Sequence, residues 1–171
     1  MSKNWLFAGL ALLAGIAASF YINSLSDKEE PSAAIRLEQI ELPDLNGNRH
    51  ALAQWQGKLL LVNFWASWCP PCLEEIPIFL SLRKKNLDDG FEVVGISVDS
   101  VQKVLRIRDS IGIDYTLLDG EKDGLSLMAN LGNHTGALPY SILFDRKGNA
   151  VHFKTGQFSQ QELEELIESY L

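Results

Sequence analysis

The sequence of 171 residues contains only two cysteines and two methionines. Two cysteines are too few for a secreted scaffold that is held together by several disulfide bonds. Positive charge is also scarce, because 15 Lys and Arg residues stand against 22 Asp and Glu residues, which gives a formal net charge of −7. This acidic balance argues against a nucleic-acid-binding protein, which would need a basic surface to contact phosphate. The remaining composition, 46% hydrophobic and 22% charged, is that of one globular domain with a small additional segment.

The longest apolar segment lies near the N-terminus, where the 18 residues from Trp5 to Ile22 carry no charge. As a helix they would extend about 27 Å, close to the ~30 Å hydrocarbon core of a bilayer. Lys3 precedes the segment and acidic residues follow it, so the positive-inside tendency puts the rest of the chain on the outer side. We therefore expect residues 1–22 to be a single-pass anchor in the cytoplasmic (inner) membrane. A cleaved signal peptide is the alternative, because residues 17–19 (Ala-Ala-Ser) form a small-residue cleavage site.

A polar tether and a folded domain follow this segment. Residues 23–35 are rich in small, polar and charged side chains and include Pro31, which is typical of a linker. Residues 36–171 have the apolar patterning of a globular domain. We expect this domain to face the periplasm or the cell exterior, whether or not the N-terminal segment is cleaved.

Apolar patterning in the domain predicts strands that alternate with helices. Strands are expected at 39–45, 48–52, 58–66, 91–98, 115–118, 140–144 and 150–154, and helices at 70–87, 101–111, 125–131 and 159–171. The first two strands flank Asn46-Gly47 and should form a tight hairpin, while Ser159 and Glu162 form a capping box at the last helix. This order predicts an α/β fold with a mixed central sheet, parallel strands inside, an antiparallel edge and helices on both faces.

The two cysteines, Cys69 and Cys72, stand at the junction between a predicted buried strand and a predicted helix. A thiol at a helix N-terminus meets the positive end of the helix dipole and free backbone N–H groups, and both stabilise the thiolate. Cys69 should therefore be the nucleophile. Cys72, one turn further along the helix, has the spacing to attack the mixed disulfide that Cys69 forms and to release the partner. Trp68 precedes this pair and is expected to contact a partner through its apolar ring.

Other uses of the two thiols are weaker interpretations of the same pair. A structural disulfide across three residues would remove little chain entropy. A zinc site would need two more ligands, and the three histidines, His50, His134 and His152, lack metal-ligand spacing. A copper chaperone or docking module could hold Cu(I) on the two thiolates, although no cluster of methionine or histidine lies nearby. We therefore expect no metal and no cofactor.

The segment Trp68-Cys-Pro-Pro-Cys-Leu-Glu-Glu-Ile-Pro77 follows an apolar strand that ends in Asn63-Phe64-Trp65. In this arrangement the chain resembles the thioredoxin fold and, within it, the TlpA/ResA group of exported, membrane-anchored thiol–disulfide oxidoreductases. The resemblance extends from about Leu37 to Leu171 and includes the leading hairpin, Gly136-Ala-Leu-Pro139 and the turn at 145–149. It implies a thioredoxin-like domain with an N-terminal β-hairpin extension, preceded by one transmembrane helix.

The resemblance also implies roles for residues around the dithiol. Pro139 would be the cis-proline that packs opposite the two cysteines, which would expose the backbone of Leu138 for pairing with an extended substrate segment. Glu75, three residues after Cys72, would exchange protons with the Cys72 sulfur if burial raises its pKa. Asn63 stands where general thioredoxins carry an aspartate. Because an amide cannot ionise, a proton relay has to lie elsewhere.

These features predict an exported thiol–disulfide oxidoreductase that reduces disulfides in other exported proteins through its Cys69/Cys72 dithiol. An oxidising compartment offers no glutathione pool, so a membrane-bound thiol electron donor would have to regenerate the dithiol. The resemblance suggests cytochrome c maturation as the pathway. The sequence does not determine the direction of electron flow, and a disulfide-forming oxidase of the same fold is the alternative.

Overall fold

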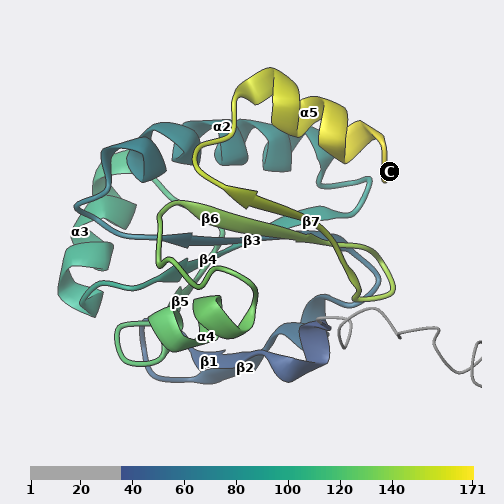
Figure 1. Cartoon of the computed structure of the whole chain (residues 1–171). Helices are drawn as coiled ribbons and strands as arrows, with labels where there is room; N and C mark the ends of the chain where they lie inside the picture. Colours follow the sequence, from purple (N-terminus) through teal and green to yellow (C-terminus); the bar gives the residue numbers. More distant parts are fainter. Residues whose placement is uncertain (1–35) are drawn as a thin grey trace, which may run out of the picture. The chain divides into compact units, whose positions relative to one another are not determined.

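The computed structural model describes residues 36–171, which contain a five-stranded mixed sheet (Figure 1). Its strands, in chain order, are β3 (Leu59–Trp65), β4 (Phe91–Ser97), β5 (Thr116–Asp119), β6 (Tyr140–Phe144) and β7 (Ala150–Thr155). In space the order is β5-β4-β3-β6-β7, with β3, β4 and β5 parallel and with antiparallel pairing from β3 to β6 and from β6 to β7. The strand β3 therefore lies at the centre of the sheet, as its uninterrupted apolar sequence predicts.

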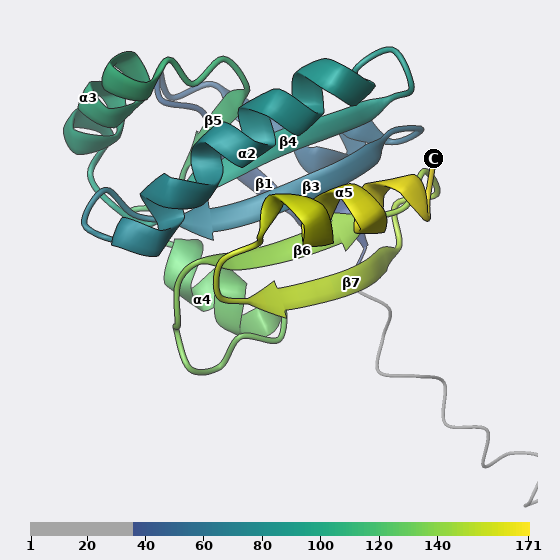
Figure 2. The ribbon, with the colours of Figure 1, turned by 90° about the horizontal axis from the view of Figure 1, so that it is seen from above.

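Helices cover both faces of this sheet (Figures 1 and 2). One face carries α2 (Pro70–Asn86), α3 (Val101–Ile111) and α5 (Gln160–Glu168). The other face carries α4 (Gly124–Asn130), the hairpin of β1 (Glu41–Pro43) and β2 (Arg49–Ala51), and the short 3-10 helices η1 (Leu37–Gln39) and η2 (Leu52–Trp55). The predicted mixed sheet, its two helical layers and the leading hairpin are confirmed.

The sheet separates two apolar cores, and β3 contributes to both because its side chains alternate between the faces. Leu61 and Trp65 belong to the core under α2, α3 and α5. Leu60 and Phe64 belong to the core shared with α4 and the hairpin. All residues of β3 are buried. Burial on both faces specifies the register of the strand, and with it the position of the loop that follows.

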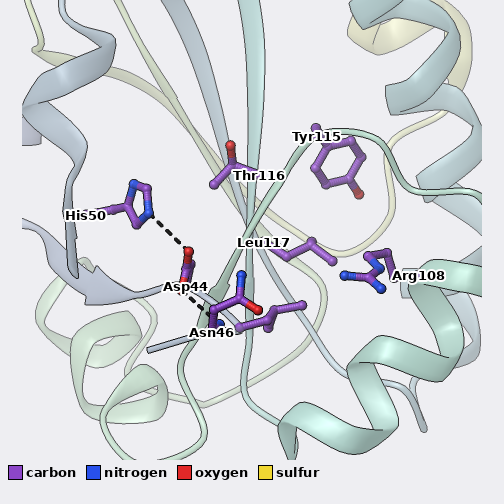
Figure 3. Close-up of a pocket in the computed structure, with 8 residues that line it drawn as sticks. Asp44, Asn46, His50, Arg108, Tyr115, Thr116 and Leu117 are labelled. Carbon is purple, nitrogen blue, oxygen red and sulfur yellow. Dashed lines mark hydrogen bonds and ion pairs between the residues drawn. The ribbon is translucent and has the colours of Figure 1, made fainter. Parts of the chain in front are cut away.

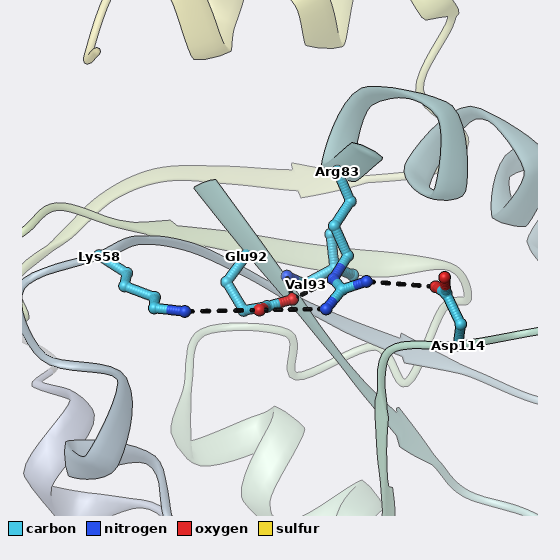
Figure 4. A network of polar contacts seen from close by, with 5 residues as sticks. All are labelled: Lys58, Arg83, Glu92, Val93 and Asp114. Atoms are coloured by element: carbon cyan, nitrogen blue, oxygen red, sulfur yellow. Dashed lines mark hydrogen bonds and ion pairs between the residues drawn. The ribbon is translucent and has the colours of Figure 1, made fainter. Parts of the chain in front are cut away.

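A network of charged side chains joins α2 to β4 (Figure 4). Glu92 is nearly buried, and its carboxylate accepts hydrogen bonds from Arg83 while Lys58 Nζ lies 3.6 Å away. The Arg83 guanidinium also lies 3.3 Å from Asp114. Burial alone would raise the pKa of Glu92, but the hydrogen bond and charge of Arg83 bring it below its ordinary value. This network fixes the C-terminal half of α2 against the sheet.

The hairpin turn is longer than the tight Asn46-Gly47 turn that the sequence predicts. It spans residues 44–48, and only Gly47 has a positive φ, of 89°. The Asp44 N–H donates to the Asn48 carbonyl (2.7 Å), and the Asp44 carboxylate accepts from the backbone N–H groups of Asn46 and Asn48. The expected hairpin and the positive φ at Gly47 are confirmed, and the Asp44 side chain helps to close a loop that extends beyond Asn46-Gly47.

The capping box expected at the start of α5 forms only in part. The Ser159 side chain accepts a hydrogen bond from the Glu162 N–H (3.2 Å). The Glu162 carboxylate, however, lies 2.7 Å from Lys154 Nζ on β7. An ion pair between two elements thus uses the group that would otherwise turn back to the N-cap.

The part of the chain that the structure describes forms one compact unit. No helix within residues 36–171 is long and apolar enough to cross a membrane. The anchor predicted at 1–22 and the tether at 23–35 lie outside the described residues. Both therefore stay predictions.

Candidate active site

Cys69 and Cys72 lie where β3 passes into α2, at the carboxyl end of the central strand. A turn closed by the hydrogen bond from the Cys69 N–H to the Ala66 carbonyl (3.2 Å) leads from the strand to the helix. Cys69 is the N-cap of α2, and its sulfur is bonded to that of Cys72 at 2.04 Å. Cys69 keeps 4% of its surface exposed, whereas Cys72 is fully buried. Of the two cysteines, Cys69 is therefore the more accessible residue.

Two prolines open α2 directly after Cys69. Pro70 and Pro71 provide no N–H groups, and the Leu73 N–H donates to the Cys69 carbonyl (3.2 Å). The first backbone N–H of the helix therefore belongs to Cys72. In the reduced protein, this N–H and the helix dipole favour negative charge on the Cys69 sulfur.

Glu75 lies one helical turn beyond Cys72 and is completely buried. Its carboxylate accepts two hydrogen bonds, from Asn63 Nδ2 (2.8 Å) and from the Phe158 backbone N–H (3.1 Å). Burial raises the pKa of Glu75 to about 7, against the lowering effect of these hydrogen bonds and of the Lys154 charge. A carboxyl group one turn from the dithiol can therefore gain or lose a proton near neutral pH.

Asn63 connects Glu75 to the centre of the sheet. On β3 it pairs with Gly95 of β4 and with Ser141 of β6. Its amide nitrogen donates to Glu75 Oε1 (2.8 Å) and to Ser141 Oγ (2.9 Å). An aspartate at this position would set a second negative charge against Glu75. The amide instead orients the Glu75 carboxylate without an ionisation of its own.

Lys154 and Phe158 complete the surroundings of Glu75, and the sequence identifies neither of them. Lys154 Nζ lies 5.2 Å from the centre of the Phe158 ring and 2.7 Å from Glu162 Oε1. These contacts hold the segment between β7 and α5, whose Phe158 N–H faces Glu75. No local pattern reveals this arrangement, because 83 residues of chain separate Glu75 from Phe158.

Because Gly95 has no side chain, two aromatic rings can pack against the sheet at the residue that pairs with Asn63. A Cβ atom at Gly95 would lie 3.1 Å from Trp65 Nε1 and 3.2 Å from Tyr115 Cε2. Within the described residues, Trp65 Nε1, the Tyr115 hydroxyl and Asn63 Oδ1 are buried and have no hydrogen-bond partner. Burial, together with the charge of Glu75, raises the pKa of Tyr115. Close approach of the rings thus depends on the missing side chain at Gly95.

Two features near the dithiol are available to a partner. Trp68 has 64% of its surface exposed, whereas Trp65 is fully buried and belongs to the core. The Leu138–Pro139 peptide bond is cis, as the resemblance implies, and Leu138 is half-buried. These two residues directly precede β6, and the first residue of β6 pairs with Phe64 near the end of β3. They therefore lie at the same end of the strands as the dithiol. His134 is exposed, and no role in the site follows for it.

A separate hollow of about 250 Å³ lies between the hairpin and the start of β5 (Figure 3). Asp44 and His50, 3.4 Å apart at Oδ2 and Nε2, line one side, and Arg108 and Tyr115 line the other. Hydrogen bonds from its own loop hold the pKa of Asp44 at about 2. The hollow lies beside the edge strand β5, which β4 separates from β3 and from the dithiol that follows β3. In the described part of the chain, no group of three His, Cys, Asp or Glu residues could hold a metal ion.

Comparisons with known proteins agree with this geometry. The model of the AhpC/TSA family matches residues 35–153. The thiol-disulfide oxidoreductase ResA of Geobacillus kaustophilus (strain HTA426) is 27% identical over 161 residues, which cover 94% of this chain and 90% of that protein.

Solved structures are similar over the folded domain. A thiol:disulfide interchange protein of the thioredoxin family from Chlorobium tepidum TLS has a TM-score of 0.71 at 23% identity, covering 81% of this chain and 97% of its own. MTB dsbF, solved in mixed oxidized and reduced forms, has a TM-score of 0.69 at 25% identity, covering 81% of this chain and 100% of its own. These similarities show the thioredoxin-like fold that the resemblance implies.

Proposed function

Because the chain belongs to the AhpC/TSA family and is a thiol–disulfide oxidoreductase, we propose that it reduces disulfides in other exported proteins. The observation that carries this proposal is the Cys69–Cys72 disulfide at the start of α2, one turn from the buried Glu75. Disulfide exchange needs a reachable sulfur, a second sulfur close to it, and a group that moves a proton near neutral pH. The arrangement supplies all three.

The reaction starts from the reduced dithiol. The Cys69 thiolate attacks one sulfur of the substrate disulfide, an S–S bond joins the two proteins, and the other substrate sulfur leaves as a thiolate. The Cys72 thiolate then attacks the Cys69 sulfur, which breaks the intermolecular bond and releases the second substrate thiolate. Two electrons pass to the substrate, and the Cys69–Cys72 disulfide of the structure is the oxidised product.

Glu75 takes the proton that Cys72 has to lose in the second step. A thiol is a much poorer nucleophile than a thiolate. Since burial brings the pKa of Glu75 to about 7, its carboxylate accepts the Cys72 proton at neutral pH and returns a proton when the dithiol is regenerated.

Substrate binding uses the backbone of Leu138 and the ring of Trp68. An extended substrate segment pairs with the main chain at Leu138, next to the cis-Pro139, in the manner of an added strand. The exposed Trp68 ring, directly before Cys69, offers apolar contact to the same segment. The segment is thereby held across the reactive sulfur.

We further propose that the enzyme acts on the outer side of the cytoplasmic membrane and that Trp5–Ile22 hold it there. The length of this apolar segment and the charges around it support the proposal. A membrane-bound thiol donor would return two electrons to the Cys69–Cys72 disulfide after each turnover, because the compartment has no reducing pool. Cytochrome c maturation is the pathway that we propose.

A covalent trap tests the function in the native host. In a Cys72→Ala variant of the full chain, the mixed disulfide on Cys69 cannot be resolved, so exported proteins with disulfides should stay attached and be identifiable by mass spectrometry. The Cys69→Ala variant is the control and should capture none. If Cys72→Ala also captures none, the proposed catalysis is wrong.

The direction of electron flow is tested by the reduction potential of the Cys69–Cys72 pair. A reductase should have a potential more negative than about −180 mV. A value near about −120 mV, at the strongly oxidising end, would contradict the reductase and favour the oxidase.

A further inference from the structure

A hollow of about 340 Å³ lies beside the turn that carries the reactive cysteine. Ser67, Lys103, Arg106 and Ile107 line it. Ser67 belongs to the turn that ends at Cys69, and the other three residues belong to α3. Figures 1 and 2 both show α3 next to the loop between β3 and α2. The hollow is therefore adjacent to the position where a substrate disulfide has to lie.

The charge on the wall of this hollow is positive. Lys103 Nζ lies 3.0 Å from Asp99 Oδ1, and the nearly buried Asp99 carboxylate also accepts a hydrogen bond from Ser67. Asp99 therefore neutralises much of the Lys103 charge. Arg106 Nε donates to the Gln102 carbonyl (3.2 Å), and within residues 36–171 its guanidinium has no carboxylate partner. Arg106 thus presents an uncompensated cation that can bind a carboxylate through two N–H groups.

The topology puts this cation across the dithiol from the cis-proline. Leu138 and Pro139 precede β6 on one side of β3, and α3 follows β4 on the other side. A substrate segment that pairs with Leu138 and passes over Cys69 continues toward α3. Substrate side chains on that side of its cysteine would then face α3 and the hollow.

We propose that this hollow, the Arg106 subsite, binds an acidic side chain that lies close to the target cysteine of the protein substrate. The proposal rests on the proposed function and names the kind of substrate that this function prefers. The carboxylate binds Arg106, and its methylene groups pack on Ile107. The net charge of the whole chain, −7, would by itself repel acidic substrates, so a preference for them can only arise locally.

Peptide disulfides that differ in one residue test the subsite. Three cyclic peptides with the same internal disulfide carry Glu, Gln or Lys next to one cysteine, and their reduction by the reduced full chain is followed by chromatography. At low salt the ratio of the Glu-peptide rate to the Lys-peptide rate should fall about two- to fivefold in Arg106→Glu, the range of one exposed ion pair. The intrinsic reactivity of the peptides cancels, because the wild type and the variant are compared on the same set. High salt should reduce the difference.

Arg108→Glu is the matched control. It changes the net charge equally and lies on the same helix, but Arg108 faces the separate hollow and pairs with Asp109. Its rate ratio should equal that of the wild type. If Arg108→Glu shifts the rate ratio as much as Arg106→Glu does, the preference comes from the overall charge of the protein. The proposed Arg106 subsite would then be wrong.

Two further results separate this proposal from the function on which it rests. If all peptides are reduced and Arg106→Glu leaves the rate ratio unchanged, the subsite is overturned and the reductase stands. If no peptide is reduced by the wild type, both are overturned.

Discussion

The pKa of Glu75 is a balance between burial and three neighbours. Burial raises it, while the Phe158 N–H, the Asn63 amide and the charge of Lys154 lower it, and the result is about 7. Burial without these partners would keep the carboxyl neutral, and exposure would keep it charged. The balance makes one residue able to accept and return a proton at neutral pH.

Glu75→Gln should slow the second step of exchange, in which Cys72 resolves the mixed disulfide. In the wild type this step should accelerate as the pH rises through about 7, because the deprotonated carboxylate is the active base. An amide accepts no proton, so the variant should be about a hundredfold slower at neutral pH and lack this inflection. Stopped-flow kinetics of mixed-disulfide decay between pH 5 and 9 measure both effects.

Glu74→Gln provides the comparison, because Glu74 is exposed on the same helix. It should keep the rate and the pH profile of the wild type. An unchanged profile in Glu75→Gln would show that Cys72 loses its proton to another group.

At the scale of elements, the fit of α2 against the sheet supports the dithiol at its first turn. Arg83 and the nearly buried Glu92 fasten the other end of this helix to β4, with Lys58 and Asp114 at the margins (Figure 4). A buried carboxylate needs its cation, so the loss of one partner costs more than the pair itself contributes.

Arg83→Ala should therefore lower the free energy of unfolding by about 1.5–3 kcal/mol at pH 7, the range for a hydrogen bond to a charged group. The contribution of a carboxylate with a lowered pKa is present above its unfolded pKa, 4.5 for Glu92, and is lost as the pH falls through the folded value. The difference between variant and wild type should accordingly shrink in acid. Urea unfolding of the oxidised wild type and variant, at pH 7 and at a pH below 4.5, measures this difference in the free energy of unfolding.

Lys85→Ala is the control for an exposed ion pair on the same helix. Lys85 lies within reach of Glu164 and Glu168 but stays exposed, so its removal should change stability little. If both variants lose the same free energy of unfolding, burial of Glu92 does not increase the cost of removing its partner.

The elements themselves could be predicted from sequence wherever one local pattern decides them. The apolar run of β3, the cysteine pair at its end and the amphipathic helices α3 and α5 follow from short-range sequence patterns. Contacts that join distant segments could not be predicted. The Phe158 N–H on Glu75 and the ion pair of Lys154 with Glu162 exist only because β7 and α5 return to α2. The turn between β1 and β2 was expected at Asn46-Gly47, but the hydrogen bonds of the Asp44 side chain to Asn46 and Asn48 were not predicted.

At the scale of the whole molecule, the acidic domain and the apolar N-terminal segment differ sharply in composition. Residues 36–171 have a core on each face of the sheet and contain no helix suited to a bilayer. The segment at 5–22 has the opposite character, with no charge in 18 residues. One chain thus combines a redox domain with a segment that we expect to keep it at a membrane.

The full chain should stay in the membrane fraction after an alkaline carbonate wash. A chain that lacks residues 2–22 should remain in the soluble fraction, because it loses the apolar segment. If the full chain is instead released, with a mature N-terminus near residue 20 by mass spectrometry, the segment is a cleaved signal peptide and the anchor is wrong.

A substitution at Gly95 would disturb residues near the reactive centre, although Gly95 lies on the neighbouring strand β4. A methyl group there would lie 2.8 Å from Leu117 Cδ2, 3.1 Å from Trp65 Nε1 and 3.2 Å from Tyr115 Cε2, so these side chains would have to shift. Trp65 ends the strand from which the cysteine turn departs. The shift would act on the residue just before the cysteine turn, although position 95 bears no functional group. A harmful natural variant of this enzyme could therefore arise on a neighbouring strand, at a glycine that takes no part in the chemistry.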